Sequence, residues 1–209
     1  MFLLLGVLLY AQDVGVLVFK KGIVKVKHPG SIIKKSIKQG YKIQTGDTVY
    51  TYNSLAKIKL NDGSIIKLGT QSEVRFAKKI EQKSGKVYYK VKHRKVGSFE
   101  VVTNFTTIGV KGTVFLVDSN SKAVALKKGV ISLSAKSGRY AVHKMKSEFD
   151  DFKRSFQQEF EEYKNKMEKE FVEYKKSFII KSNTMVVFRG NNAYEKKLDP
   201  RVFKFFESF

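Results

Sequence analysis

Two glycines enclose a lysine in the stretch T-T-I-G-V-K-G-T-V-F-L-V-D, residues 106–118, and such a spacing could serve to bind phosphate. A P-loop, however, has the pattern G-x-x-x-x-G-K-[ST] and leads into a helix, whereas Thr113 and Phe115 here belong to an apolar run typical of a β-strand. The RNA-binding G-x-x-G loop joins two helices, and no helical pattern flanks Gly109 and Gly112. We therefore expect this stretch to be structural, with Gly112 at a bend or bulge between two strand segments.

The other residue types that carry chemistry are few and scattered. The three histidines, His28, His93 and His143, lie far apart, and the chain contains no cysteine. No Asp or Glu stands at a metal-ligand spacing from them, and no serine lies in a G-x-S-x-G nucleophile elbow. The sequence therefore predicts a protein that is not an enzyme and has no metal site and no cofactor.

Short runs of alternating apolar and polar residues, rich in Val, Ile, Thr, Tyr and Phe, fill residues 13–142. This composition and period are typical of half-buried strands, and turn residues separate the runs about every ten positions. The clearest turns are Gly46-Asp47 and Asp62-Gly63, where a glycine supplies the positive φ of a tight reversal. An adjoining glycine also favours a turn over a catalytic carboxylate pair. We predict an all-β domain here, as a solenoid or a sandwich.

The positive charge of the chain is concentrated in this β-rich part. The net charge of the whole chain is +22, and residues 14–142 carry 26 Lys and Arg against 6 Asp and Glu, a net of +20. Most of these lysines alternate with apolar residues, as on the solvated face of a sheet. This pattern predicts solubility and a general affinity for anionic surfaces, and makes nucleic acid an unlikely partner for an exported protein.

The chain divides into four predicted segments, 1–12, 13–142, 143–178 and 179–209. The first segment contains the uncharged apolar run Phe2–Ala11, which is shorter than the roughly 20 residues that span a bilayer. Its length and its small closing residue match a secretory signal peptide, so we expect export to the periplasm or the envelope. A first buried strand is the alternative interpretation.

The third segment contains three aligned eleven-residue repeats that begin at Met145. Large apolar residues recur with spacings of four, three and four, which predicts a long amphipathic helix that ends near residue 178. This stripe consists of Met145, Phe149, Phe152, Phe156, Phe160, Tyr163, Met167, Phe171, Tyr174 and Phe178. Because aromatic residues are costly to expose, the stripe needs a partner. The candidates are the β-body itself, a second copy of the helix in a coiled-coil pair, and a membrane surface.

The last segment returns to a strand pattern, so the long helix is predicted to be an insertion before the last strand of the β-body. Asp199 is a good N-cap and Pro200 a good first helical residue for a short terminal helix. We expect this helix to plug an open end of the β-structure.

The series of motifs across residues 14–135 resembles the FecR-domain family. The matching elements are VGVLVFKKGIVKVK, the turn of residues 44–47, LNDGSIIKLGTQSEVRF, SFEVVTNFTTIGVKGTVFLV and VALKKGVISLS. The resemblance implies an exported, solenoid-like β-domain that works by binding and signalling. Regulators of this family contact the signalling domain of an outer-membrane receptor and control a sigma factor through a cytoplasmic segment. This chain shows no such segment before its apolar run, so only the periplasmic recognition module is expected here.

The predicted function is therefore that of a non-enzymatic, exported FecR-like module that recognises a protein or envelope partner. The alternative is a structural protein that attaches to anionic lipid or cell-wall polymer through its basic β-face.

Overall fold

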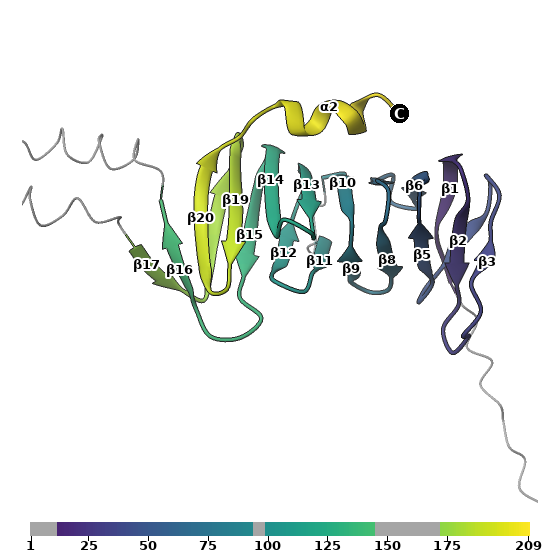
Figure 1. The fold of residues 1–209 in the computed structure, drawn as a ribbon, viewed down its shortest axis with the longest axis horizontal. Coiled ribbons are helices and arrows are strands. Elements are labelled where there is room, and N and C mark those ends of the chain that lie inside the picture. Colours follow the sequence, from purple (N-terminus) through teal and green to yellow (C-terminus); the bar gives the residue numbers. More distant parts are fainter. Residues whose placement is uncertain (1–11, 94–98, 145–171) are drawn as a thin grey trace, which may run out of the picture.

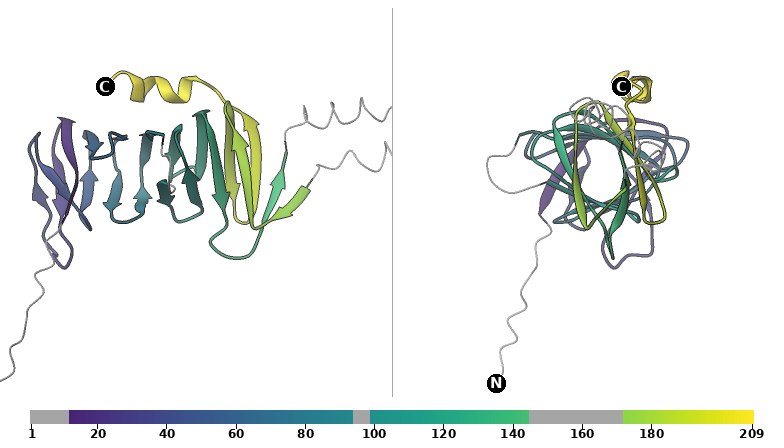
Figure 2. Two further views of the ribbon diagram at one scale, coloured as in Figure 1. Left: turned by 180° about the vertical axis from the view of Figure 1, so that it is seen from behind. Right: turned by 90° about the vertical axis from the view of Figure 1, so that its left-hand side faces the viewer.

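The computed structural model describes residues 12–93, 99–144 and 172–209, which form two large β-sheets and one short helix (Figure 1). The strands lie across the long axis of the body, and successive turns of the chain stack along it. Seen from the end, strands surround the axis on all sides (Figure 2). The described residues are thus all-β, in a flattened solenoid of two facing sheets.

Within the described ranges the larger sheet, sheet A, has eleven strands and the smaller, sheet B, has nine. In spatial order, sheet A consists of β17 (Val172–Lys175), β16 (Tyr140–His143), β20 (Asn192–Lys197), β19 (Thr184–Arg189), β14 (Ala123–Lys128), β13 (Val114–Asp118), β10 (Lys86–Lys90), β7 (Ile65–Leu68), β6 (Leu55–Leu60), β1 (Asp13–Lys21) and β4 (Lys42–Gln44). Sheet B consists of β18 (Ser177–Lys181), β15 (Val130–Ser134), β12 (Thr107–Val110), β11 (Phe99–Val102), β9 (Ile80–Ser84), β8 (Glu73–Phe76), β5 (Thr48–Thr51), β2 (Val24–Lys27) and β3 (Lys35–Ser36).

The period-two alternation of the sequence places one side chain in two between the sheets. In β6, for example, Ala56 and Ile58 are fully buried, while Lys57 and Lys59 face outward. In the middle of the body the ring of Tyr89 stacks on that of Phe115, with 4.8 Å between centroids. One apolar core of this kind runs the length of the body and holds both sheets together.

A polar side chain is anchored inside this core. Gln82 is 1% exposed, and its Nε2 donates to the carbonyl oxygens of Gly85 and Val117 at 2.9 and 3.1 Å. Its Oε1 accepts a hydrogen bond from the hydroxyl of Tyr89 at 2.9 Å. Burial raises the pKa of Tyr89, so the hydroxyl keeps its proton. Gln82 thereby ties β9 of sheet B to β10 and β13 of sheet A.

The prediction of a long helix that continues to Phe178 is wrong in the part of it that is described. Val172–Lys175 is strand β17, paired with β16, and Ser177–Lys181 is strand β18, paired with β15. Phe178 and Ile180 are buried while Ile179 is 63% exposed, which is a strand period. The rest of the predicted helix and of its stripe, residues 145–171, lies outside the described residues. Four strands, β17 to β20, follow that segment, whereas the sequence predicted one.

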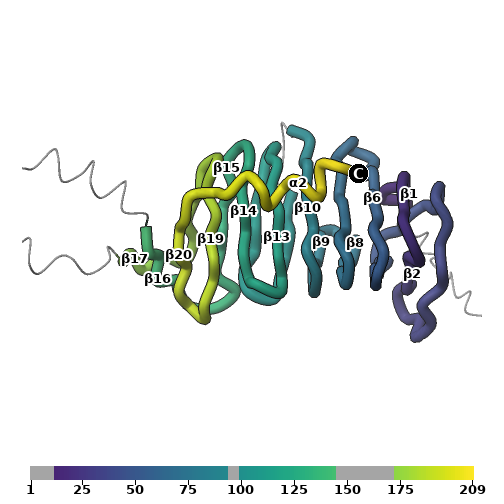
Figure 3. The backbone as a smooth tube through the Cα atoms, turned by 45° about the horizontal axis from the view of Figure 1, so that its top comes forward, coloured from purple at the N-terminus to yellow at the C-terminus, as the bar shows by residue number. Residues whose placement is uncertain are grey.

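The described helix, α2 (Arg201–Glu207), does not plug an end of the body. It lies along the outer face of sheet A, across several strands (Figure 3). Phe203 and Phe206 are buried against Tyr88, Leu116 and Ala125 of β10, β13 and β14. These three residues point outward from sheet A, and an apolar helix face covers them. Before the helix, Asp199 accepts a hydrogen bond from the backbone N–H of Arg201 at 2.9 Å.

Candidate binding groove on the outer face of sheet B

The candidate site is a groove on the outer face of sheet B, over strands β11, β12, β15 and β18. The register of these strands places Glu100 beside Gly109, Gly109 beside Ser132, and Ser132 beside Ile179. All four positions face outward, since their neighbours Ile108, Ile131 and Ile180 are buried in the core. Four strands, which come from residues 99 to 181 of the chain, therefore contribute to one row of outward side chains.

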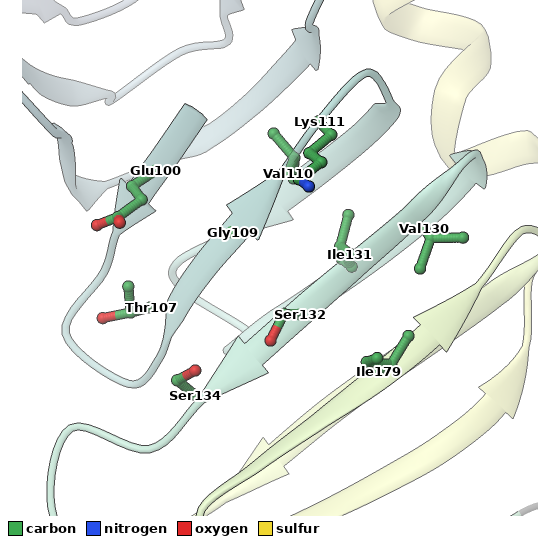
Figure 4. A pocket seen from close by; sticks show the side chains of 10 residues that line it. All are labelled: Glu100, Thr107, Gly109, Val110, Lys111, Val130, Ile131, Ser132, Ser134 and Ile179. Carbon is green, nitrogen blue, oxygen red and sulfur yellow. The ribbon is translucent and has the colours of Figure 1, made fainter. Parts of the chain in front are cut away.

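The groove exists because the middle of this row is small. Gly109 has no side chain, and an added Cβ would meet only Ser132 Cβ, at 4.0 Å. Hydroxyl side chains of Thr107, Ser132 and Ser134 line the neighbouring floor (Figure 4). The resulting depression has a volume of about 460 Å³.

The rim of the groove is apolar on one side and charged on the other. Val130 and Ile179 are 53% and 63% exposed on adjacent strands, β15 and β18. Lys111 and Glu100 lie on the other side (Figure 4). Glu100 already pairs with Lys79, with 2.5 Å between Oε2 and Nζ. Lys111 is then the cation that the groove offers to a ligand, beside two exposed aliphatic side chains.

The lining of the groove combines polar and apolar groups. The lining contains hydroxyls, aliphatic groups, one lysine and one carboxylate, and no histidine stands near enough to be among them. In the described part of the chain, no group of three or more His, Cys, Asp or Glu side chains could hold a metal ion. Among the same residues, no helix is long and apolar enough to cross a membrane.

The predicted motif residues Gly46 and Asp47 lie in the turn between β4 and β5, towards the other end of the body from the groove. Gly46 has φ of 91°, and a Cβ there would lie 2.5 Å from the ring of Pro29. Asp47 is fully buried; its Oδ1 lies 2.7 Å from His28 Nδ1, and its Oδ2 accepts from the N–H of Gln44 at 3.0 Å. No sequence pattern connects His28 with Asp47, and the fold brings the two side chains together.

Asp62 and Gly63 form the tight turn between β6 and β7. Asp62 Oδ1 accepts from the N–H of Ser64 at 2.8 Å, and Gly63 has φ of 83°. Neither residue lies in the groove. Their arrangement is that of a turn, with the carboxylate bonded to its own backbone.

The two glycines of the G-V-K-G stretch have different environments. Gly112 lies between β12 and β13 with φ of 151°, and a Cβ there would lie 2.8 Å from His93 Cα. Thr113 and Phe115 follow it as buried residues. Gly109, in contrast, forms part of the floor of the groove, and Lys111 lies at the rim. In this stretch the backbone conformation therefore requires a glycine at position 112, whereas Gly109 and Lys111 belong to the groove.

The same stretch ends at Asp118, whose charge is stabilised locally. Its burial opposes ionisation, but hydrogen bonds from Ser121 and the nearby ammonium group of Lys86 outweigh that cost and lower the pKa of the carboxyl. Lys86 Nζ lies 3.3 Å from Asp118 Oδ2, and the two residues are cross-strand partners. The pair supports the join between β10 and β13.

The remaining histidine, His143, also contacts its neighbours in the fold. Its Nε2 lies 3.0 Å from Asn192 Oδ1, and its ring stacks on Tyr194 at 4.3 Å. The three histidines therefore lie at three separate places in the structure.

Sequence reasoning missed the groove as a site, although one signal was available. In V-I-S-L-S, residues 130–134, small polar residues alternate with buried aliphatic ones, and the same holds for Thr107 and Gly109 in T-I-G-V. Such a pattern predicts a shallow outer surface wherever the two strands pair. Ile179 could not be added, because the sequence does not show that the strand predicted after residue 178 pairs with residues 130–134.

Comparisons with known proteins agree with this architecture. The family described as FecR protein matches residues 41–139. Two crystal structures of a proposed anti-sigma factor from Parabacteroides distasonis ATCC 8503 share the fold. One has a TM-score of 0.51 at 12% identity, over 74% of this chain and 61% of that one. The other has a TM-score of 0.50 at 13% identity, over 73% and 59%.

At such low identity these two structures are evidence for the fold alone. This chain spans about six-tenths of the length of each. No curated protein matches the sequence significantly. The matched residues 41–139 include β4 to β15, and with them three of the four groove strands, β11, β12 and β15. Residues 41–139 of this chain therefore match the FecR family.

Proposed function

We propose that this chain is a non-enzymatic signalling module that binds an extended segment of a protein partner in the groove on sheet B. The FecR domain and the fold shared with a proposed anti-sigma factor support a signalling or regulatory role. The observation that carries the proposal is the row Glu100–Gly109–Ser132–Ile179. Because Gly109 has no side chain, this row is hollow between a charged rim and an apolar rim.

An extended peptide fits this surface better than a compact small molecule does. The groove is open and shallow, and small ligands bind in concave sites that cover most of their surface. The hydroxyls of Thr107, Ser132 and Ser134 can bond to backbone groups of a peptide. Full burial of an exposed side chain of this size is worth about 1.5–3 kcal/mol, so covering the exposed parts of Val130 and Ile179 contributes about half of that for each.

The position of β18 adds a second means of recognition. It is the last strand of sheet B among the described residues and pairs only with β15 there. An extended segment beside it could continue the sheet through main-chain hydrogen bonds, and side chains of that segment would reach the groove. Lys111 would favour an acidic residue in the partner.

We place this activity outside the cytoplasmic membrane, in the periplasm or the envelope. The apolar run Phe2–Ala11 and the FecR domain support this location. Recovery of the protein from the cytoplasmic fraction, with residues 1–11 intact by mass spectrometry, would contradict export.

The binding proposal can be tested by site-specific photo-crosslinking in whole cells. A photoreactive residue would replace Ile179 at the groove or, as a control, Ile23, which is 61% exposed in the turn between β1 and β2. We expect a discrete protein adduct from position 179 that is absent from position 23. The proposal fails if position 179 gives no protein adduct or if both positions give the same one.

A further inference from the structure

A second surface stands out at the opposite end of the body, in the loop of residues 28–34 between β2 and β3. Two adjacent isoleucines form its tip, and Ile32 is 93% and Ile33 62% exposed. Single exposed aliphatic residues are common on protein surfaces. The packing of this fold does not explain why two consecutive isoleucines are this exposed.

The loop is held in place at its base, so the exposure of its tip is built into the fold. His28 at its start lies 2.7 Å from the buried carboxylate of Asp47, and Pro29 packs against Gly46. Ser31 donates its N–H to the carbonyl of His28 at 3.1 Å, and its Oγ accepts from the N–H of Ile33 at 3.0 Å.

Beyond the isoleucines, the charged end of the loop is also fixed. Lys34 Nζ lies 3.8 Å from the centre of the Tyr50 ring, which is a cation–π contact. The apolar tip is thereby presented next to an ordered lysine, as a preformed feature.

The residues that flank the tip in the sequence carry positive charges and no negative ones. Residues 14–46 contain eight lysines and no Asp or Glu. The flanking carboxylates are already paired, Asp13 with Lys42 at 3.2 Å and Asp47 with His28. The eight lysines are Lys20, Lys21, Lys25, Lys27, Lys34, Lys35, Lys38 and Lys42.

The first described residue of the chain lies at the edge that presents this loop. The described chain begins at Gln12, whose carbonyl accepts from the N–H of Thr45 at 2.8 Å. Thr45 precedes Gly46, which packs against Pro29 in the loop. The described chain therefore enters the β-body at the same edge that presents Ile32 and Ile33.

From these observations we infer that the loop of residues 28–34 docks on an anionic phospholipid bilayer. Ile32 and Ile33 enter the boundary between headgroups and acyl chains, and the lysines around them contact the anionic headgroups. Exposed aliphatic side chains followed directly by lysines, here Lys34 and Lys35, are a pattern of proteins that bind at membrane interfaces. This goes beyond the proposed function, because it uses a different surface and sets the orientation of the module at the membrane.

The test measures partition of the full chain onto vesicles of equal parts phosphatidylethanolamine and phosphatidylglycerol. The double variant Ile32→Ser/Ile33→Ser should lower the partition coefficient at least about tenfold, because two aliphatic side chains no longer leave water. Lys35→Gln should lower it about fivefold, since one lysine near an anionic surface contributes about that factor. The control Ile179→Ser, the same substitution at one exposed isoleucine of the groove, should leave it unchanged.

A local reporter removes the contribution of other apolar parts of the chain. Because the chain has no cysteine, Ser31→Cys and Ser208→Cys each accept one environment-sensitive fluorophore. We expect a blue shift with anionic vesicles at position 31 and none at position 208. Phosphatidylcholine vesicles should give little shift at either position.

Three results would overturn the inference. The first is equal partition of wild type and the Ile32→Ser/Ile33→Ser variant, and the second is an equal shift at positions 31 and 208. The third is a wild-type oligomer that this variant dissociates in light scattering, since the loop would then be a contact between copies. The photo-crosslink at position 179 is independent of all three, so the two proposals fail separately.

Discussion

The two glycines of the G-V-K-G stretch offer a sharp test of the structure, because alanine should have opposite effects at the two positions. At Gly109 an added Cβ would lie 4.0 Å from its nearest neighbour, an ordinary contact distance. The alanine would also restrict the unfolded chain. Gly109→Ala should therefore stabilise the protein by about 0.4–1 kcal/mol.

At Gly112 the added Cβ of an alanine would clash with backbone atoms. With φ of 151° and a Cβ 2.8 Å from His93 Cα, either the turn or the segment at His93 must shift. Strain in a sparsely populated conformation costs about 1–3 kcal/mol, and overpacking costs a similar amount. Gly112→Ala should thus destabilise the protein by about 1–3 kcal/mol, which places the two variants about 1.5–4 kcal/mol apart.

Urea unfolding followed by far-UV circular dichroism measures this difference. The slope of free energy against urea should be the same for both variants, so that the midpoints report stability. In a thermal scan, each 1 kcal/mol corresponds to roughly 2–4 °C for a chain of this size. Equal destabilisation by both alanines, or a neutral Gly112→Ala, would refute the environments assigned to the two glycines.

Three further changes probe the core, a surface carboxylate and the terminal helix. Tyr89→Phe should cost about 1–3 kcal/mol in urea unfolding, because Gln82 Oε1 is left buried without its donor; a neutral result would contradict that hydrogen bond. The lowered pKa of Asp118 gives stability that is present above its unfolded pKa and lost as pH falls through its folded pKa. The free-energy difference between wild type and Asp118→Asn should therefore shrink on acidification, and a difference that does not depend on pH would refute the assignment. Phe206→Ala removes a side chain that is 1% exposed and should cost up to about 3–5 kcal/mol; the backbone amides of α2 should exchange hydrogen faster, and an unchanged rate would argue against the docking of α2.

The strands of the β-body could be predicted from the sequence because their period is local. Lys57 and Lys59 alternate with buried aliphatic residues in one strand. The residue types of a turn such as Asp62-Gly63 likewise predict its positive φ. Such signals need no knowledge of what the strand pairs with. They predicted the β character of residues 13–142 and the approximate places of the turns.

The segment around Phe178 shows where local pattern fails. The helical spacing that begins at Met145 extends formally to Phe178, but Phe178 and Ile180 also fit a strand with a buried face. Pairing with β15 and burial against Tyr140 decide between the two, and both partners are distant in the sequence. Tertiary contact therefore overrides the local pattern at this point.

The groove and the His28–Asp47 contact could not be predicted for a similar reason. Glu100, Gly109, Ser132 and Ile179 become neighbours only through the register of three strand pairs. A register shift of one residue in any of these pairs would place the side chain of a groove residue in the core. Residue types could suggest a shallow outer surface, while its position depends on the folded sheet.

The central claim is that the groove on sheet B binds a protein partner, and the affinity of that partner for a groove-filling variant tests it most directly. The partner would be the protein captured at position 179, and binding would be measured with purified components. Gly109→Leu places a side chain on the floor without a backbone clash and should weaken binding at least about tenfold, which corresponds to about 1.4 kcal/mol. The Ile32→Ser/Ile33→Ser variant, changed only at the distant loop, should bind like wild type. Unchanged affinity of Gly109→Leu, with its unfolding midpoint intact, would contradict the account.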